Sequence, residues 1–431
     1  MADELAAPAA ERTDGGGDEL GGAGGAGEAA ADVTPLLEPS EGIPEVVADA
    51  GAYAEALERL AAGSGPVAVD AERASGYRYG QRAYLVQLRR RGAGTVLIDP
   101  VACPDLSGLD EVLASDEVVL HAATQDLPCL AEVGVRPRRL FDTELAGRLL
   151  GHPRVGLGSM VETVLGLRLE KGHSAADWST RPLPEDWLRY AALDVEVLIE
   201  LRDALERQLV ESGKLEWALE EFAAVASAPP REPRADPWRR TSGIHRIRDR
   251  RGLAVVRALW NERDAVARDR DLSPGRVVPD SAIVAAAQAM PKSPQALAEL
   301  RPFTGRLARR YLMTWFRALD RARALPESEL PVPSTPGDGP PPVNRWAERE
   351  PVAARRLEAA RGVVTSLAQR HSMPPENLLQ PDPVRRLAWS PPRPIDAETV
   401  AARLREYHAR EWQVGLAAAP LAAALRAAEA G

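Results

Sequence analysis

The chain of 431 residues is long enough for two or three domains with complete hydrophobic cores. Its hydrophobic content of 45% and charged content of 27% are ordinary for a soluble protein. The net charge of −9 divides into opposite segments, because residues 1–50 contain twelve acidic residues and one basic residue, whereas residues 231–325 contain 21 basic and 10 acidic residues. The basic segment favours a phosphate-rich partner, although solvated charge alone would also account for it.

Cysteine content and apolar runs exclude further classes of protein. The two cysteines, Cys103 and Cys129, lack the spacing of a zinc site, so neither zinc nor structural disulfides are expected. The N-terminus lacks the basic and apolar segments of a signal peptide, and the longest apolar stretch, 416–425, is about half of a membrane span. We therefore expect a cytoplasmic protein with no membrane partner.

Taken in chain order, residues 1–45 are rich in glycine, alanine and acidic residues, which predicts a disordered acidic tail. The first three predicted strands lie close enough in sequence to form an antiparallel meander. Helices and strands then alternate, which favours an α/β fold with a parallel or mixed sheet and an active site at the carboxyl ends of its strands. The predicted elements are helix 51–62, strands 66–72, 83–88 and 95–98, helix 106–114, strand 118–120, helix 124–133, strand 140–141 and helix 143–150.

The rest of the chain is predicted to be mostly helical. One long helix spans 184–212, with Pro184 in its first turn and Gly213 at its end. Two helical blocks follow, the first at 243–325 and the second at 345–431, and their similar size suggests one module used twice. The linkers before and between the blocks, both containing prolines, span 229–242 and 326–344.

A pair of acids on the first predicted strand indicates a metal site. Asp70 and Glu72 are two residues apart, so they point to the same side of the strand, about 6.6 Å apart along it. Two carboxylates this close resist ionisation unless a cation lies between them. Mg²⁺ prefers such oxygen ligands, and two-metal sites hold their ions about 3.5–4 Å apart. A strand with an acidic, solvent-facing end would produce the same pattern.

Two further patterns contain polar residues that could join this site, one after a predicted strand and one on a predicted helix. Asp126 opens a helix five residues after His121, where a favourable interaction with the helix dipole would also explain it. Tyr190 and Asp194 share one face of the long helix, near its apolar boundary, where a charge needs a partner. An ordinary amphipathic helix with a half-buried tyrosine would also show this pair. A tyrosine one turn away would orient or deprotonate a metal-bound water. We interpret Asp142 as a helix N-cap and His121 as a packed residue at a strand end.

The order D-x-E, H-x4-D and Y-x3-D resembles the proofreading-type 3′–5′ exonuclease superfamily, in the subgroup whose last motif carries a tyrosine. The resemblance implies that four acids hold two divalent metal ions, Mg²⁺ or Mn²⁺, and that Tyr190 positions the attacking water. The four acids implied are Asp70, Glu72, Asp126 and Asp194.

A closer resemblance is to bacterial ribonuclease D and covers about residues 50–215. Its motifs are matched by DWSTRPL at 177–183, RYAALDV at 189–195 and FDT at 141–143. One departure is Trp187, where many members carry a glutamine. This departure puts local packing or a substrate contact in doubt but not the reaction.

The helical blocks strengthen the resemblance. The first looks like the helicase-and-ribonuclease-D C-terminal (HRDC) domain, a nucleic-acid-binding module, and the second like a more divergent copy. Their arginines would give salt-dependent, sequence-tolerant binding to phosphates. The implied architecture is a ribonuclease-H-like mixed-sheet exonuclease domain at 46–228, followed by two small all-α domains.

The implied function is hydrolysis of RNA 3′ ends, with tRNA precursors as substrates and 5′-nucleoside monophosphates as products. One alternative is a DNA 3′–5′ exonuclease in repair, because nothing in the sequence reports on a 2′-hydroxyl or excludes single-stranded DNA. Another is a nucleic-acid-binding protein whose nuclease site has decayed, but retention of all four acids and the tyrosine argues against it. We also expect the domain 46–228 to fold without the helical blocks, since few core contacts should cross the first linker.

Overall fold

The computed structural model of the chain describes residues 33–430 except 171, 174, 231, 233 and 334–338. Most of the predicted tail and parts of both predicted linkers therefore lie outside the described residues. The prediction of disorder up to residue 45 is wrong for Thr34–Leu36, which forms strand β1. The reason is a parallel backbone pairing with β8 (Leu167–Leu169), which satisfies the peptide groups of both short segments.

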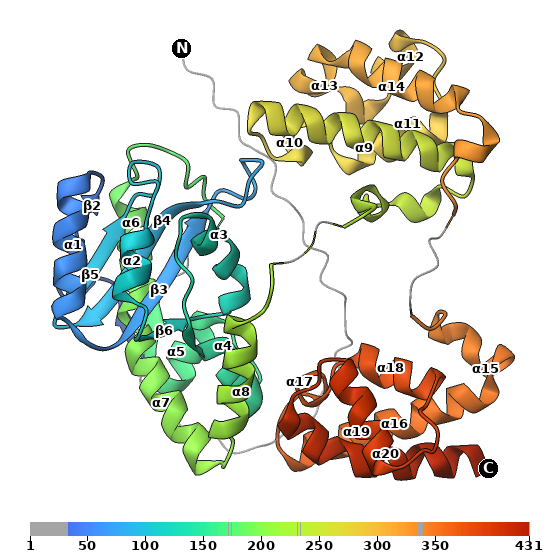
Figure 1. The fold of residues 1–431 in the computed structure, drawn as a ribbon. Helices are drawn as coiled ribbons and strands as arrows, with labels where there is room; N and C mark the ends of the chain where they lie inside the picture. The colour runs from blue at the N-terminus through green and yellow to red at the C-terminus, as the bar shows by residue number, and fades with distance from the viewer. Residues whose placement is uncertain are drawn as a thin grey trace, which may run out of the picture.

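A mixed sheet forms the N-terminal part, as predicted (Figure 1). It has six strands in the order β2-β5-β4-β3-β6-β7, of which β2 was not predicted. Strands β3, β4 and β5 make the expected antiparallel meander, and β2, β6 and β7 join in parallel. Because β3 is almost wholly apolar from Val67 to Val69, it is buried on both faces at the centre of the sheet. The strands are β2 (Val46–Val47), β3 (Ser64–Arg73), β4 (Ala83–Arg91), β5 (Gly94–Ile98), β6 (Glu117–Leu120) and β7 (Arg139–Asp142).

Helices cover both faces of this sheet. Figure 1 shows α2 on one side and α6 on the other, and α6 packs on β3, β4 and β5. The sheet-domain helices are α1 (Ala50–Ala62), α2 (Ser107–Val112), α3 (Leu127–Glu132), α4 (Thr143–Leu150), α5 (Leu157–Leu165), α6 (Glu185–Glu196), α7 (Leu198–Glu211) and α8 (Leu215–Ala226).

The prediction of one long helix over 184–212 is wrong in one respect. The segment is divided at Val197 into two helices, α6 and α7. Val195 and Val197 are β-branched residues with lowered helix propensity, and both are buried. The division also lets the two helices follow different strands, since α7 packs on β3 and β6.

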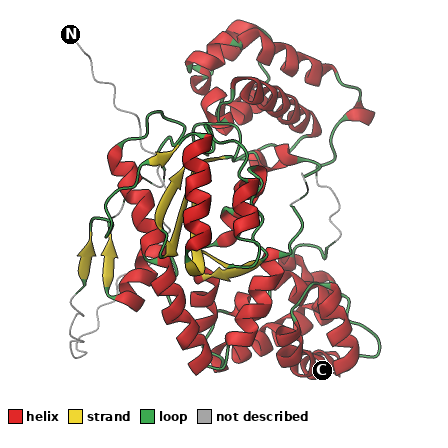
Figure 2. Ribbon diagram, turned by 60° about the vertical axis from the view of Figure 1, so that its left-hand side comes forward, coloured by secondary structure: helices red, strands yellow, loops and turns green. Residues whose placement is uncertain are grey.

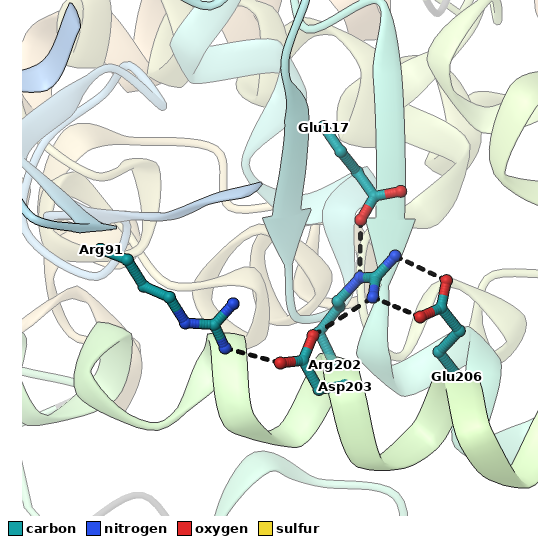
Figure 3. Close-up of polar contacts among 5 residues, drawn as sticks. All are labelled: Arg91, Glu117, Arg202, Asp203 and Glu206. Atoms are coloured by element: carbon teal, nitrogen blue, oxygen red, sulfur yellow. Dashed lines mark hydrogen bonds and ion pairs between the residues drawn. The ribbon is translucent and has the colours of Figure 1, made fainter. Parts of the chain in front are cut away.

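A cluster of ion pairs fixes α7 to the sheet (Figure 3). Arg202 donates to Glu117 at the start of β6 (2.7 Å) and to Glu206 on its own helix (2.5 Å). Arg91 at the end of β4 donates to Asp203 (2.6 Å). Burial alone would lower the pKa of Arg202, but its bonds to the two glutamates raise it. The cluster thereby sets the position of the helix that continues from α6.

The first helical block has a hydrophobic core of its own, in which Phe303 and Trp315 are each 1% exposed. Its larger helices are α9 (Arg250–Arg270), α11 (Asp280–Ala289) and α14 (Leu312–Ala324), with short helices α10 (Pro274–Val277), α12 (Pro294–Ala298) and α13 (Arg306–Arg310) between them. Such a core satisfies the main requirement for independent folding.

The second helical block shares a continuous hydrophobic core with the sheet domain, so the expectation that few core contacts would reach it is wrong. Trp217 of α8 stacks on Trp412, with ring centroids 4.9 Å apart. The buried Lys214 ammonium donates to the carbonyl oxygens of Leu149 (2.6 Å) and Ser372 (3.4 Å). The helices of this block are α15 (Trp346–Arg349), α16 (Pro351–Arg370), α17 (Pro375–Leu378), α18 (Pro381–Trp389), α19 (Ala397–Glu406) and α20 (Glu411–Ala430).

Two other sequence-based expectations can be compared with the described residues. Cys103 and Cys129 are both buried and free, in agreement with the expected absence of a disulfide between them. None of the described helices combines the length and the apolar character that crossing a bilayer requires.

Candidate active site

Three of the predicted acids come together between β3 and α6. Asp70 and Glu72 project from the face of β3 that α6 covers, and Tyr190 and Asp194 lie one turn apart on that helix. As a result, carboxylate oxygens of Asp70, Glu72 and Asp194 all lie within 4.8 Å of one another. Glu72 is 8% exposed and Asp194 is 9% exposed, so this cluster is largely removed from water.

The fourth predicted acid, Asp126, lies beside this cluster and is paired with an arginine. It follows a 3₁₀ turn, Ala123–Gln125, and directly precedes α3, so the helix predicted over 124–133 is shorter than expected. Its side chain does not cap α3. Instead, Arg73 Nη2 lies 3.4 Å from Asp126 Oδ1, and Arg73 Nη1 donates to the Gln125 carbonyl oxygen. Burial, together with the charge of Asp70, raises the pKa of Asp126 to about 8.

The four acids lie close together with little positive charge beside them. Burial raises the pKa of Glu72, and the charges of Asp70 and Asp194 raise it further. Burial likewise raises the pKa of Asp70 and of Asp194. In the described part of the chain, Arg73 is the one basic residue that forms an ion pair with any of the four acids. Clustered oxygen ligands with so little countercharge fit a divalent cation such as Mg²⁺ or Mn²⁺.

Gln87 is a site residue that sequence reasoning missed. It lies opposite Asp70 on β4 and is fully buried. Its Nε2 donates to Asp70 Oδ2 (3.3 Å), while its Oε1 has no hydrogen-bond partner among the described residues. Only the register between β3 and β4 identifies this glutamine, because no motif contains it.

Asp142 caps α4 as predicted, by accepting hydrogen bonds from the backbone N–H groups of Glu144 and Leu145. It has a second role that the sequence did not reveal. The same carboxylate also accepts from the N–H groups of Ala122 (3.1 Å) and Ala123 (2.9 Å). Because these residues begin the turn that carries Asp126, Asp142 fixes the position of that acid.

Aromatic side chains surround the Tyr190 ring. It packs edge-on against His173, with centroids 5.8 Å apart, and near the fully buried Trp178. Trp187, the departure from the family pattern, packs on both His173 and Trp178, so it has a packing role here. Burial and the charges of Asp194 and Glu72 raise the pKa of Tyr190. Its hydroxyl therefore remains protonated and acts as a hydrogen-bond donor.

The residues at 177–183 fix this aromatic group to the sheet. Arg181 makes a bidentate ion pair with Asp99, with distances of 2.7 and 2.8 Å, and donates to the Trp178 carbonyl oxygen. Burial alone would raise the pKa of Asp99, but the hydrogen bonds from Arg181 lower it. Paired, two-point contacts of this kind hold a loop in one orientation.

The loop that follows the acidic strand, residues 74–82, contacts the first helical block. The Tyr79 hydroxyl donates to Asp264 (2.9 Å) and accepts from Arg268 (3.0 Å), two residues of α9. Arg276 of α10 donates to a backbone carbonyl oxygen of the loop (2.9 Å). These contacts place the basic block next to the strand that carries Asp70 and Glu72.

The mixed sheet and its acidic site define a nuclease of the 3′–5′ exonuclease class. A family model described as a 3′-5′ exonuclease matches residues 44–210, and the HRDC domain model matches residues 252–319. The second helical block is matched by a separate model, described as a 3′ to 5′ exonuclease C-terminal domain, at residues 339–425.

Relatives narrow this class to one family. Ribonuclease D of Acidiphilium cryptum is 32% identical over 337 residues, which cover 75% of this chain and 84% of that protein. The crystal structure of Escherichia coli RNase D matches with a TM-score of 0.64 and 29% identity, over 84% of this chain and 99% of that one. A protein from Bifidobacterium adolescentis matches with a TM-score of 0.84 and 38% identity, over 91% and 100% of the two chains. The chain belongs to the ribonuclease D family and is a 3′–5′ exoribonuclease.

Proposed function

We propose that Asp70, Glu72, Asp126 and Asp194 hold two divalent cations, Mg²⁺ or Mn²⁺, at which RNA is hydrolysed from its 3′ end. The observation that carries this proposal is the approach of three largely buried carboxylates to within 4.8 Å. Bound cations would lower the pKa of a water molecule and stabilise the departing 3′-oxygen. The products would be 5′-nucleoside monophosphates.

The chain's own residues would orient the reactants. The protonated Tyr190 hydroxyl, one turn from Asp194, would hold the attacking water by donating or accepting a hydrogen bond. Gln87 keeps one oxygen of Asp70 in a fixed direction, which leaves the other for a cation. Arg73 and Asp142 fix Asp126 at the edge of the site.

We further propose that the substrates are structured RNAs with single-stranded 3′ ends, with tRNA precursors as the specific class, and that the protein acts in the cytoplasm. Escherichia coli RNase D is an exoribonuclease involved in structured RNA processing. In this chain, Arg306 and Arg309 are exposed on α13 and have no ion-pair or side-chain hydrogen-bond partner among the described residues. Such arginines are suited to phosphate contacts along the body of an RNA.

The experiment that tests the substrate compares an end-labelled tRNA precursor with single-stranded DNA of the same 3′ sequence, each with Mg²⁺ and with Mn²⁺. We expect stepwise shortening of the RNA from its 3′ end and release of 5′-monophosphates. Faster digestion of the DNA would favour a DNA repair exonuclease instead. Binding without digestion of either substrate would indicate a decayed site.

A further inference from the structure

A cavity of about 740 Å³ opens beside the three clustered acids. Tyr190 and Asp194 lie on its inner wall, and residues at the start of α5 form another wall, with the exposed Arg154 just before them. A volume of this size is within the range of about 300–1,000 Å³ of small-ligand sites. It therefore has room for the end of one nucleic-acid strand, but the reaction chemistry does not explain the apolar part of its lining.

Part of the cavity lining comes from residues 33–41, which we call the N-terminal strap. Its first part is β1, which pairs with β8 apart from the main sheet (Figure 2). Its second part is fixed to α6, since Glu38 forms an ion pair with Arg189 (3.1 Å) and the Ser40 hydroxyl donates to Glu196 (2.5 Å). Arg189 immediately precedes Tyr190, so the strap is anchored to the helix that carries two of the site residues.

Two apolar residues of the strap, Pro35 and Leu37, line the cavity. Leu37 is 56% exposed, although the pairing of β1 and the ion pair of Glu38 hold the chain on both sides of it. The neighbouring cavity walls carry charged and polar groups. An exposed apolar surface beside a cationic residue fits a nucleotide, whose base has an apolar face and whose phosphate is anionic.

We propose that the N-terminal strap is a specificity determinant of this exoribonuclease. The cavity receives the terminal nucleotide of a single-stranded RNA 3′ end, Leu37 packs on its base or on the next base, and Arg154 contacts a phosphate. The strap limits the width of the cavity beside Asp194, so a paired 3′ end does not enter. This inference rests on the proposed function, since it assumes that the RNA reaches Asp194 through this cavity.

The contact with Leu37 is tested in the full chain by Leu37→Ser, with Val210→Ser as the matched control. Val210 is 57% exposed and lies on α7, outside the cavity lining. For a short single-stranded RNA we expect Leu37→Ser to raise KM about fivefold with kcat unchanged, as for loss of part of one apolar contact. Binding of the same RNA to an Asp70→Asn background, measured by fluorescence anisotropy, should weaken by a similar factor. The control should change neither value.

Exclusion of paired ends by the strap is tested by the double variant Glu38→Gln and Ser40→Ala, which removes the ion pair with Arg189 and the hydroxyl bond to Glu196. We expect digestion of a hairpin with a paired 3′ end to rise several-fold relative to digestion of the single strand, with thermal unfolding as a check on the fold. Unchanged KM in Leu37→Ser together with an unchanged substrate ratio in the double variant would overturn the role of the strap. Failure of the wild-type protein to digest any RNA would instead overturn the proposed function.

Discussion

The Tyr190 hydroxyl lies one turn from Asp194, whereas its ring packs against His173 and Trp178, so the two parts of the side chain have separate surroundings. Replacing it with phenylalanine keeps the ring and removes only the group that would orient water. We expect Tyr190→Phe to lower the single-turnover rate by about 10²-fold or more, because orienting groups contribute about 10²–10⁴-fold. Stabilisation of the protein by Mn²⁺ should be retained. An unchanged rate, with chemistry limiting, would leave Tyr190 as a packing residue.

His121 makes a testable contribution to the pH dependence of stability. Its ring contacts the Thr143 hydroxyl, and burial lowers its pKa to about 4 from 6.5. Above pH 6.5 the ring is neutral in both the folded and the unfolded chain, so its contribution to stability is complete there. As the pH falls from 6.5 to about 4, the unfolded chain takes up the proton first, and at most about 3 kcal/mol is lost. We expect His121→Gln to lose less stability over this range in denaturant titrations, and equal losses would contradict the prediction.

Short motifs were sufficient to predict which acids belong to the site. They did not predict the residues that fix the positions of these acids. Asp70 and Glu72 are two apart on an apolar strand, and this spacing alone places their side chains on one face. Gln87 reaches Asp70 only through the register of β3 with β4. Asp142 fixes the turn before Asp126 through contacts between separate segments, which no local pattern records. The assignment of the acids as metal ligands stays a prediction.

The loop 74–82 is the element through which the first helical block contacts the sheet domain. We expect Tyr79→Phe to loosen this contact, because the hydroxyl bonds to both Asp264 and Arg268. The matched control is Tyr77→Phe in the same loop, since the Tyr77 ring lies under Arg276 but no hydrogen bond of its hydroxyl is seen among the described residues. The predicted result is faster proteolysis of the linker 229–242 and weaker binding of structured RNA in Tyr79→Phe alone. Identical behaviour of the two variants would contradict this role.

Long, strongly patterned elements were predictable, whereas short ones that depend on tertiary pairing were not. The three strands of the meander were found because each carries its own apolar run. Strands β1 and β8 have three residues each and exist through their mutual pairing, so neither has a sufficient local signal. The division of the 184–212 helix at Val197 likewise depends on which strands the two halves pack against.

For the whole molecule, the two helical blocks should respond differently to deletion. Truncation after Ser227 would remove the second block and expose the core that it shares with the sheet domain, including the face of Trp217. We expect this fragment to aggregate or to unfold at a lower temperature, contrary to the modular behaviour expected from the linker alone. Composition revealed the linker, but it could not reveal which block shares a core across it.

Internal deletion of residues 234–333, with a Gly/Ser linker in their place, should leave a folded protein, because the first block has its own core. We expect similar turnover on short single-stranded RNA but weaker binding of structured precursors. The slope of log affinity against log salt should become shallower by roughly one unit, or less, for each lost phosphate contact. Equal salt slopes with and without the block would show that its arginines form a solvated surface.

The central claim is that the carboxylates clustered between β3 and α6 form a metal-dependent site for hydrolysis of RNA 3′ ends. The most direct test measures single-turnover digestion and binding of an end-labelled RNA by the wild-type and Asp70→Asn proteins, each with Mn²⁺ and with EDTA. The control is Glu55→Gln, on the exposed face of α1. We predict digestion by the wild type and the control only with metal, and no digestion but intact RNA binding by Asp70→Asn, which keeps the shape of the side chain and removes a ligand charge. Digestion by Asp70→Asn within a few-fold of the wild-type rate, or undiminished digestion in EDTA, would contradict the claim.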